Sequence, residues 1–388
     1  MTKKIMLISI DGNEANQISR VGVGEYGFQL LTQLKVLGSR FEVRSQNFKY
    51  QIFLKEKPLQ SLPEETEWWK YKVVGPRFLW TQISLPLALS QAKPIPDVFF
   101  TPTHYAPRFS PCPRVISIMD LSYLYFPEMF KKRDLWKLKK WTAYSVRKAK
   151  KILTISNSTR DDIIKHYKIK PTKVVVGYPG HKNIKYQISN IKMTIKNAKR
   201  KYGIGGDYIL YVGTLQPRKN LIRLIEAFVI IKKQVTKSLK LVIVGKKGWM
   251  YEEIFQKVKD LGLEKEVIFT GYVSDNELPV LYQSAKCFVL VSLYEGFGFP
   301  VLEALSFGVP VVTSNVSSLP EIVGKAGVLV NPNDVKDIVR GINEVFDYNE
   351  LKRQEMIRKG LEQAKKFSWE KCAKETLEVL IEVGSGSQ

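Results

Sequence analysis

Short apolar runs alternate with segments of helical periodicity along most of the chain, and this alternation is typical of parallel α/β layers. In the first half, the predicted strands are Ile5–Ile10, Asp97–Phe100, Val115–Met119 and Ile152–Ile155. A helix is predicted over Glu25–Leu37, where Gly38 ends it. In the second half, the predicted strands are Tyr208–Val212, Leu241–Val244, Val267–Gly271, Cys287–Val291 and Val309–Thr313, with a helix over Leu221–Val235.

The two series of elements are separated by residues 182–201, which are rich in lysine and hold few large apolar side chains. This composition predicts a connector. With 388 residues, of which 44% are hydrophobic, the chain can bury two cores. We therefore predict two α/β domains, residues 1–185 and 200–369, each with the doubly wound Rossmann-like arrangement. In such sheets, ligands bind at the carboxyl ends of the strands.

The segment from Glu295 to Glu303 follows a predicted strand through a short loop. Pro300 suits the first turn of a helix, and Gly308 ends that helix after about two turns. The helix would point free N–H groups at the strand ends, where they can bind a phosphate. Two carboxylates beside a phosphate site are favourable only if they bind hydroxyls, such as those of a sugar and a ribose. The alternative is an ordinary strand, loop and helix with two surface glutamates.

A second segment, Gly213–Asn220, joins a predicted strand to a helix that Asn220 would cap. Arg218 and Lys219 then lie at the positive end of that helix, where their charges oppose the helix dipole. An incoming diphosphate would reverse the sign of this interaction. The alternative is a pair of solvated basic residues in a loop.

Two features of the first half are weaker signals. Gly22–Gly27 reads G-x-G-x-x-G, but it does not follow the first strand directly, as a dinucleotide-binding turn should. A flexible lip over a cleft between the domains fits better, and Glu42 keeps a nucleotide-cofactor oxidoreductase as an alternative. His104 follows the strand Asp97–Phe100 and so is placed at a strand end.

With these residues, the chain resembles the retaining glycosyltransferases of the two-domain GT-B fold, family 4. The resemblance covers nearly the whole chain and is strongest in Tyr211–Leu221, Ser292–Ala304, Gly308–Ser314 and Leu319–Val323. It implies two Rossmann-like domains that face a central cleft, with the acceptor in the N-terminal one. It also implies that a last helix, about residues 370–383, crosses back to the N-terminal domain near Phe367–Trp369.

The resemblance also implies roles for single residues. Glu295 would contact the donor sugar near the reacting centre, and Glu303 would bind the ribose. The remaining implied contacts are Arg218, Lys219, Gly22 and Gly24 for the donor diphosphate, Phe297, Gly298 and Phe299 for the donor sugar, the Val301 amide for phosphate, and Tyr272 and Val273 for the nucleobase.

The chain departs from the family pattern at two places that bear on the site. Thr214 stands where the family often has Arg, which would leave more of the phosphate charge to Arg218. Met119-Asp120 stands where many relatives have a His-Asp pair. His104 would then be the remaining N-domain histidine near the cleft, and Asp120 the second N-domain candidate for a catalytic role.

We expect neither a metal nor a bound cofactor, since no D-x-D triplet occurs and the three cysteines and three histidines have no metal-ligand spacing. The nucleotide sugar would be a substrate, of the GDP-mannose or UDP/ADP-glucose type, and the acceptor a glycan, a lipid or a small molecule. Scattered, unpaired cysteines predict a cytoplasmic protein.

The net charge of +24 is concentrated in the first half: residues 1–201 hold 37 Lys and Arg against 14 Asp and Glu. The densest part, Lys131–Lys151, has helical spacing of Leu135, Leu138, Thr142 and Val146. Its lysines are either a solvated face or a surface that docks on an anionic membrane or an anionic acceptor. A basic nucleic-acid-binding protein is a third function class; it leaves the motifs of the second half unexplained, and we expect no nucleic-acid partner.

Overall fold

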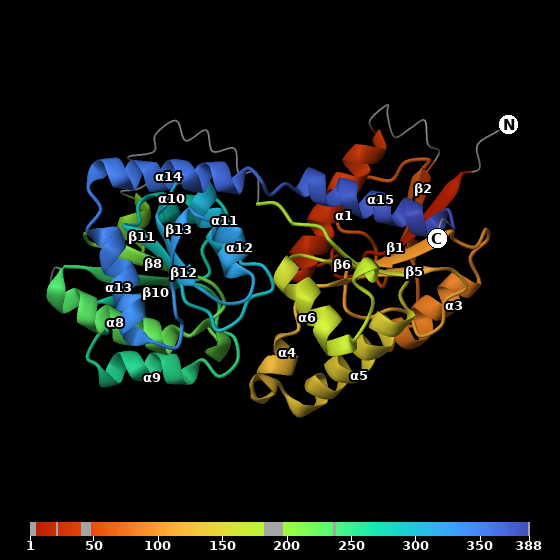
Figure 1. Cartoon of the computed structure of the whole chain (residues 1–388). Helices are drawn as coiled ribbons and strands as arrows, with labels where there is room; N and C mark the ends of the chain where they lie inside the picture. Colours follow the sequence, from red (N-terminus) through yellow and green to blue (C-terminus); the bar gives the residue numbers. More distant parts are fainter. Residues whose placement is uncertain (1–4, 21, 40–47, 182–196, 236–237, 387–388) are drawn as a thin grey trace. The chain divides into compact units, whose positions relative to one another are not determined.

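Two α/β units make up the chain, and Figure 1 shows their elements. This computed structural model describes residues 5–20, 22–39, 48–181, 197–235 and 238–386. The first unit comprises residues 1–180 and 368–388, and the second comprises residues 181–367. Within the described ranges, no helix combines the length and the apolar character needed to cross a bilayer.

The first unit is built on a seven-stranded parallel sheet with the order β3-β2-β1-β4-β5-β6-β7. Its central strands are buried on both faces, as expected for a parallel sheet covered by helices. The strands are β1 (Met6–Asp11), β2 (Phe48–Leu54), β3 (Trp69–Val73), β4 (Val98–Thr101), β5 (Arg114–Ile118), β6 (Lys151–Thr154) and β7 (Val174–Val176). The helices are α1 (Val23–Ser39), η1 (Trp80–Ser84), α3 (Leu85–Ser90), α4 (Ser122–Tyr125), η2 (Pro127–Met129), α5 (Lys132–Lys148), α6 (Asn157–Tyr167), η3 (Pro171–Lys173) and α15 (Trp369–Gly384).

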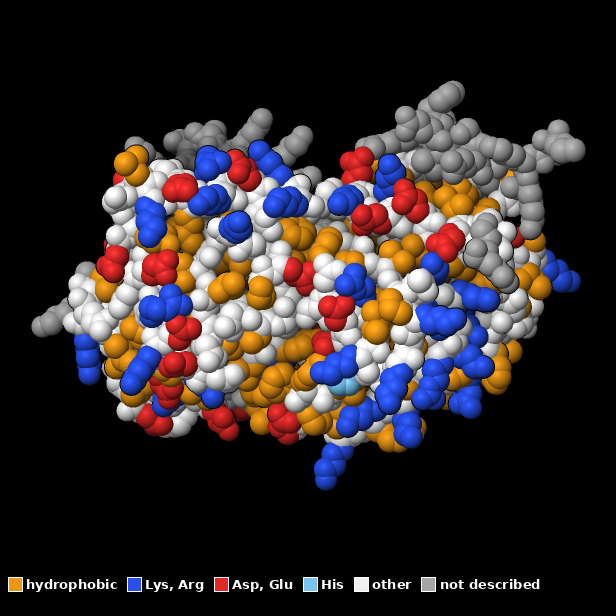
Figure 2. All heavy atoms as spheres, viewed as in Figure 1, with side chains coloured by type: hydrophobic (Ala, Val, Ile, Leu, Met, Phe, Trp, Pro, Cys, Tyr) orange, Lys and Arg blue, Asp and Glu red, His pale blue; other side chains and the backbone are white. Residues whose placement is uncertain are grey.

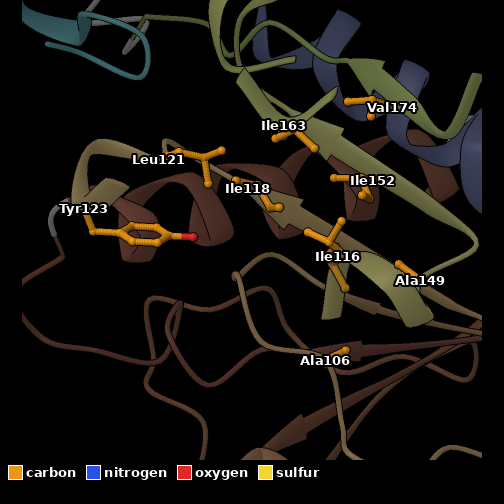
Figure 3. Close-up of a cluster of buried hydrophobic side chains, with 10 residues drawn as sticks. Ala106, Ile116, Ile118, Leu121, Tyr123, Ala149, Ile152, Ile163 and Val174 are labelled. Carbon is orange, nitrogen blue, oxygen red and sulfur yellow. The ribbon is translucent and has the colours of Figure 1, made fainter. Parts of the chain in front are cut away.

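One core cluster of this unit explains the placement of α5. Ile116 and Ile118 of β5 and Ile152 of β6 pack with Ile163 of α6, as Figure 3 shows. Val146 of α5 belongs to the same cluster, and Leu135 and Leu138 pack against it from the same helix. The predicted apolar spacing of α5 is therefore confirmed, and it leaves the lysine-bearing faces outward.

The last helix, α15, belongs to the first unit and lies beside α1 in Figure 1. The chain returns between Phe367 and Ser368, where the predicted crossing point lies. Ser368 caps the helix by accepting from the Lys371 N–H, and the Trp369 ring packs 5.9 Å from that of Tyr26. A β-carbon at Gly180 would stand 2.3 Å from the Trp369 backbone nitrogen, so only glycine allows this close approach.

The second unit has a six-stranded parallel sheet with the order β10-β9-β8-β11-β12-β13. Its strands are β8 (Tyr208–Val212), β9 (Lys240–Val244), β10 (Val267–Gly271), β11 (Cys287–Leu290), β12 (Val311–Ser314) and β13 (Gly327–Val330). Its helices are η4 (Pro217–Lys219), α8 (Leu221–Gln234), α9 (Glu252–Asp260), α10 (Leu278–Gln283), α11 (Phe299–Ser306), α12 (Leu319–Val323), α13 (Val335–Phe346) and α14 (Glu350–Ala364).

The predicted strands are all present, with ends that shift by up to two residues. The sequence did not predict β2, β3, β7 and β13. In β3, lysines alternate with aromatic residues and only Trp69 is buried, so the strand lacks a continuous apolar run. Most of the predicted connector, residues 182–196, lies outside the described residues.

Candidate active site

In the second unit, the site is set by the place where strand order reverses. β8 and β11 are neighbours in the sheet, although 74 residues of the chain lie between Val212, the end of β8, and Cys287, the start of β11. Each strand feeds a loop at its carboxyl end, and such a switch point is where ligands bind in open α/β sheets. The loop after β8 carries Arg218 and Lys219, and the loop after β11 carries Glu295.

These three side chains form one buried ion cluster. Lys219 Nζ lies 2.5 Å from Glu295 Oε1, and Arg218 Nη1 lies 3.3 Å from Glu295 Oε2. Ser292 donates its hydroxyl to Glu295 Oε1 at 2.7 Å. Glu295 and Lys219 are 7% and 9% exposed, so water screens the pair little. Two cations share one carboxylate, which leaves the cluster with a net positive charge.

The charges decide the protonation state of Glu295. Burial raises the pKa of this carboxyl, but the charges of Lys219 and Arg218, with hydrogen bonds from Lys219 and Ser292, lower it to about 2. Glu295 is therefore a carboxylate at neutral pH. In this arrangement it accepts hydrogen bonds and orients the two basic side chains, rather than acting as a general acid.

Backbone contacts hold the two loops together. Arg218 also donates to the Tyr294 carbonyl, and the Leu293 N–H donates to the Arg218 carbonyl at 2.9 Å. Ser318 donates to the Glu295 and Phe297 carbonyls at 2.9 and 2.8 Å. These bonds fix the loops before any ligand arrives.

Asn220 corrects one prediction. It occupies the N-cap position of α8, but its side chain does not cap the helix. Its Nδ2 instead donates to the carbonyls of Val291 and Pro332, at 2.9 and 2.7 Å. Asn220 thereby joins the η4 loop to the end of β11. Its backbone has a φ of 60°, a conformation that asparagine tolerates better than most residues.

The predicted helix after Glu295 is α11, and Gly298 begins it. Gly298 has a φ of 110°, and a β-carbon there would lie 2.8 Å from Leu319 Cδ2, so the position requires glycine. The ring of Phe297 is buried and packs 5.0 Å from that of Phe299. The Val301 N–H, predicted to meet phosphate, donates here to the Gly298 carbonyl at 2.9 Å.

Glu303 lies within α11, and the predicted nucleobase contacts Tyr272 and Val273 follow β10. Tyr282 of α10 donates its hydroxyl to Glu303 Oε2 at 3.1 Å, a partner that the sequence did not indicate. Tyr272 is 64% exposed, whereas Val273 is buried. The Lys246 ammonium lies 4.9 Å from the centre of the Tyr272 ring, which gives that ring a cationic neighbour.

In the first unit, the strand order reverses between β1 and β4, and a buried acid that sequence analysis missed lies there. Asp11 ends β1 and accepts from the Asn13 N–H and from Trp80 Nε1, both at 3.1 Å. Thr101, the last residue of β4, donates to its other oxygen at 3.4 Å. Burial raises the pKa of Asp11 to about 6, against the opposing effect of the hydrogen bonds from Asn13 and Trp80. The available signal was an acid at the end of an apolar first strand.

His104 and Asp120 are brought together at the same edge. His104 Nε2 accepts from the Met119 N–H at 3.2 Å, so the proton of the neutral ring is on Nδ1. Burial lowers the pKa of His104, and the Asp120 carboxylate opposes this to a smaller degree. Asp120 accepts from the Ser122 N–H and hydroxyl at 2.9 and 2.7 Å, which fixes its carboxylate.

The prediction of a flexible glycine loop over Gly22–Gly27 is wrong from Val23 onward, because α1 begins there. Gly22 precedes the helix with a φ of 53°, and Gly24 is buried in the first turn. A β-carbon at Gly24 would stand 2.9 Å from the Glu14 carbonyl oxygen. This glycine therefore lets α1 pack against the segment that follows β1, which explains the motif without a dinucleotide.

The Glu295 cluster makes a testable contribution to stability. The lowered pKa corresponds to about 3 kcal/mol of stabilisation from the ionised form. This contribution is complete above the unfolded-state pKa near 4.5 and is lost as pH falls through about 2. We expect Glu295→Gln to lower stability strongly at pH 7, and the difference from the wild type to shrink between pH 4.5 and 2.5. Urea unfolding at several pH values measures it.

The control is Glu355→Gln, which removes the exposed pair with Lys359 on α14 and should change little, since exposed ion pairs contribute little. A Glu295→Gln difference that stays constant from pH 7 to 2.5 would contradict the buried carboxylate.

Comparison with known proteins gives the family. Residues 22–181 match the model of Glycosyltransferase Family 4, and residues 194–363 match that of Glycosyl transferases group 1. O-antigen chain mannosyltransferase B of Escherichia coli is 36% identical over 269 residues, which cover 68% of each chain. The serotype-specific mannosyltransferase WbdA of Escherichia coli is 34% identical over 200 residues, which are 50% of this chain but 24% of that one.

A sucrose-phosphate synthase from Thermosynechococcus elongatus has the same fold, with a TM-score of 0.75 over 98% of this chain and 100% of that one, at 17% identity. The fold is thus GT-B, with two parallel-sheet, Rossmann-like units. Both halves match by sequence, and the ion cluster lies in the half that matches group 1. The chain is a glycosyltransferase and belongs to family 4, group 1.

Proposed function

We propose that the protein transfers mannose, with retention of anomeric configuration and without a metal, from a nucleoside-diphosphate mannose to a glycan acceptor. One observation carries the proposal: the buried cluster of Arg218, Lys219 and Glu295 has a net positive charge at the carboxyl edge of the sheet. A diphosphate is the part of the donor that this charge suits. The names of the E. coli relatives support mannose as the sugar.

Catalysis in this proposal is electrostatic. As the bond between the sugar C1 and the diphosphate oxygen breaks, negative charge grows on the leaving group, and Arg218 and Lys219 stabilise it. Glu295 keeps both cations in place through contacts that exist without the donor. The acceptor oxygen bonds to C1 on the face that the diphosphate leaves, and its proton passes to a phosphate oxygen. These steps balance atoms and charges without a protein nucleophile.

A second group of residues is proposed from the first unit. A neutral His104, held by the Met119 N–H, and the fixed Asp120 carboxylate would orient the donor sugar or the acceptor. Asp11, at the end of the neighbouring strand, would support the loops around them. Gly22 and Gly24 would approach the diphosphate through the N-terminus of α1. Glu303 would bind the ribose, with Tyr272 and Val273 beside the base.

Activity without a metal is part of the proposal. In the part of the chain that the structure describes, no three His, Cys, Asp or Glu side chains gather in a way that would hold a metal ion. The two cations of the cluster supply the charge that a metal would otherwise provide.

The function is tested with a panel of donors. If the donor is GDP-mannose, GDP raises the melting temperature more than UDP or ADP. A ligand at 100-fold its Kd adds about 2.7 kcal/mol to the free energy of unfolding, which makes the shift measurable. GDP-mannose should then support transfer to a mannose-terminated oligosaccharide, with an α-linked product by NMR and unchanged rates in EDTA. A β-linked product would overturn retention. Loss of activity in EDTA with rescue by Mn²⁺ would overturn metal independence, and preference for a glucose donor would replace mannose.

Kinetics separate the roles of the two ends of the donor. Lys219→Ala should lower kcat by roughly 100-fold or more, because charge on the diphosphate grows in the transition state.

Glu303→Ala should raise the donor KM with a smaller change in kcat, because the ribose contacts are the same in the ground state and in the transition state. Tyr282→Phe should raise that KM more modestly, since it leaves Glu303 in place and removes the hydroxyl that donates to Glu303 and, at 3.4 Å, to the Pro300 carbonyl. A collapsed kcat with an unchanged KM in Glu303→Ala would contradict the ribose role.

We also propose that the protein works in the cytoplasm, on the inner face of an anionic membrane, through α5. Figure 2 shows Lys and Arg side chains gathered over the α5 side of the first unit. Lys132, Lys139 and Lys140 are exposed, and so is Trp136, an apolar ring suited to the headgroup region. Each basic group near an anionic leaflet contributes about 1 kcal/mol.

Membrane docking predicts co-sedimentation with anionic but not neutral vesicles at low salt. Binding should fade as the Debye length falls from about 10 Å at 0.1 M salt to about 3 Å at 1 M. Changing Lys137, Lys139 and Lys140 to Glu should abolish it. The same change at Lys325, Lys336 and Lys352, which are exposed on the second unit, should not. Equal recovery with both lipids would reject docking.

A further inference from the structure

A pocket of about 540 Å³ opens in the first unit, and none of its lining residues is assigned above to the transfer reaction. Its lining comes from the C-terminal end of α3, the loop between β4 and β5, the start of β5 and the last turns of α5. The lining residues are Ser90, Arg108, Phe109, Ser110, Pro111, Arg114, Tyr144 and Lys148. Three of them are cationic, three carry hydroxyls, and no carboxylate is among them.

The pocket lies at the amino edge of the sheet. Arg114 is the first residue of β5, whereas Asp120 follows the other end of that strand. The strand rises about 13 Å between its ends. A ligand in the pocket is therefore separated by the length of the strand from the edge that carries His104 and Asp120.

The cationic groups are positioned by the fold. Arg114 Nη1 donates to the Pro107 carbonyl at 2.8 Å and to the Tyr144 hydroxyl at 3.5 Å, and Tyr144 donates to the Arg108 carbonyl. Within the described ranges, Nε and Nη2 of Arg114 make no hydrogen bond, and none of Arg108, Arg114 and Lys148 pairs with a carboxylate. The Arg114 guanidinium is half-buried, and its Nε–H and Nη2–H groups can donate together to two oxygens of one anion.

The rim of the pocket is apolar. Phe109, 68% exposed, belongs to the lining. Leu87, 51% exposed, lies one helical turn before Ser90 on the same face of α3. Figure 2 shows basic and hydrophobic side chains mixed over the α3 and α5 side of this unit.

We propose that this pocket is a second binding site, separate from the transfer site, which takes a phosphate group through Arg108, Arg114 and Lys148. Three cations without a counterion repel one another, and a phosphate relieves that repulsion while its oxygens accept from the fixed Arg114 fork. The phosphate belongs either to a soluble phosphate ester or to a phospholipid headgroup whose chains leave past Phe109 and Leu87. The proposal does not depend on the donor or the acceptor of the transfer reaction.

The test uses the full chain and two probes, inorganic pyrophosphate and phosphatidylglycerol vesicles. The test variant is Arg108→Gln with Lys148→Gln, which leaves the Arg114 contacts intact. The matched control is Lys165→Gln with Lys168→Gln, two exposed lysines of the same unit near the end of α6. Both variants remove the same charge. A second variant, Arg114→Lys, keeps the charge and removes the fork.

By calorimetry at low salt, we expect the wild type and the control to bind one more pyrophosphate than the test variant, whose pocket Kd rises by about tenfold for each lost cation. Arg114→Lys should weaken the same site. A soluble ester is the ligand if vesicle retention is equal in the test and control variants. A headgroup is the ligand if the test variant alone loses retention. Equal pyrophosphate stoichiometry and equal retention in both variants would overturn the proposal.

Discussion

The second unit depends on one buried carboxylate. Glu295 lies between Lys219 and Arg218, and without it two cations would stand at the carboxyl edge of the sheet with little solvent to screen them. A buried charge with no partner is strongly destabilising, so the pairing must form if the loops are to pack. The carboxylate therefore fixes loop geometry and leaves one net positive charge for a ligand.

The same constraint explains the surrounding polar residues. Ser292 satisfies a Glu295 oxygen, Ser318 satisfies the carbonyls on either side of the glycine-containing turn, and Asn220 joins the two loops. Buried polar networks stabilise a structure only when their members are satisfied. These hydroxyl and amide groups bind no donor atom in the proposed reaction, and yet the positions of Arg218 and Lys219 depend on them.

The sequence predicted what local patterns determine. β8 has the predicted bounds because it is an uninterrupted apolar run, and α11 ends where Gly308 and Pro310 require it. It also placed Glu295, Arg218 and Lys219 at strand ends. It could not predict their ion pairs, because these require β8 and β11 to be neighbours in the sheet. Asn220 is a second case that local sequence could not predict. Its residue type suits a helix cap, but its side chain donates instead to two carbonyls that are distant in the sequence.

The two units also differ in how charge is placed. In the second unit Arg218 and Lys219 are paired with Glu295, so their charge attracts an anion only at short range, once it reaches the cluster. In the first unit exposed basic side chains lie along α5, and a further group of cations lines the pocket at the amino edge. Charge at that edge contributes little to a reaction at the other end of the strands, since water and salt screen exposed groups beyond about 10 Å. The basic groups at the amino edge therefore add little to the proposed transfer step, and we assign them to the proposed phosphate site instead.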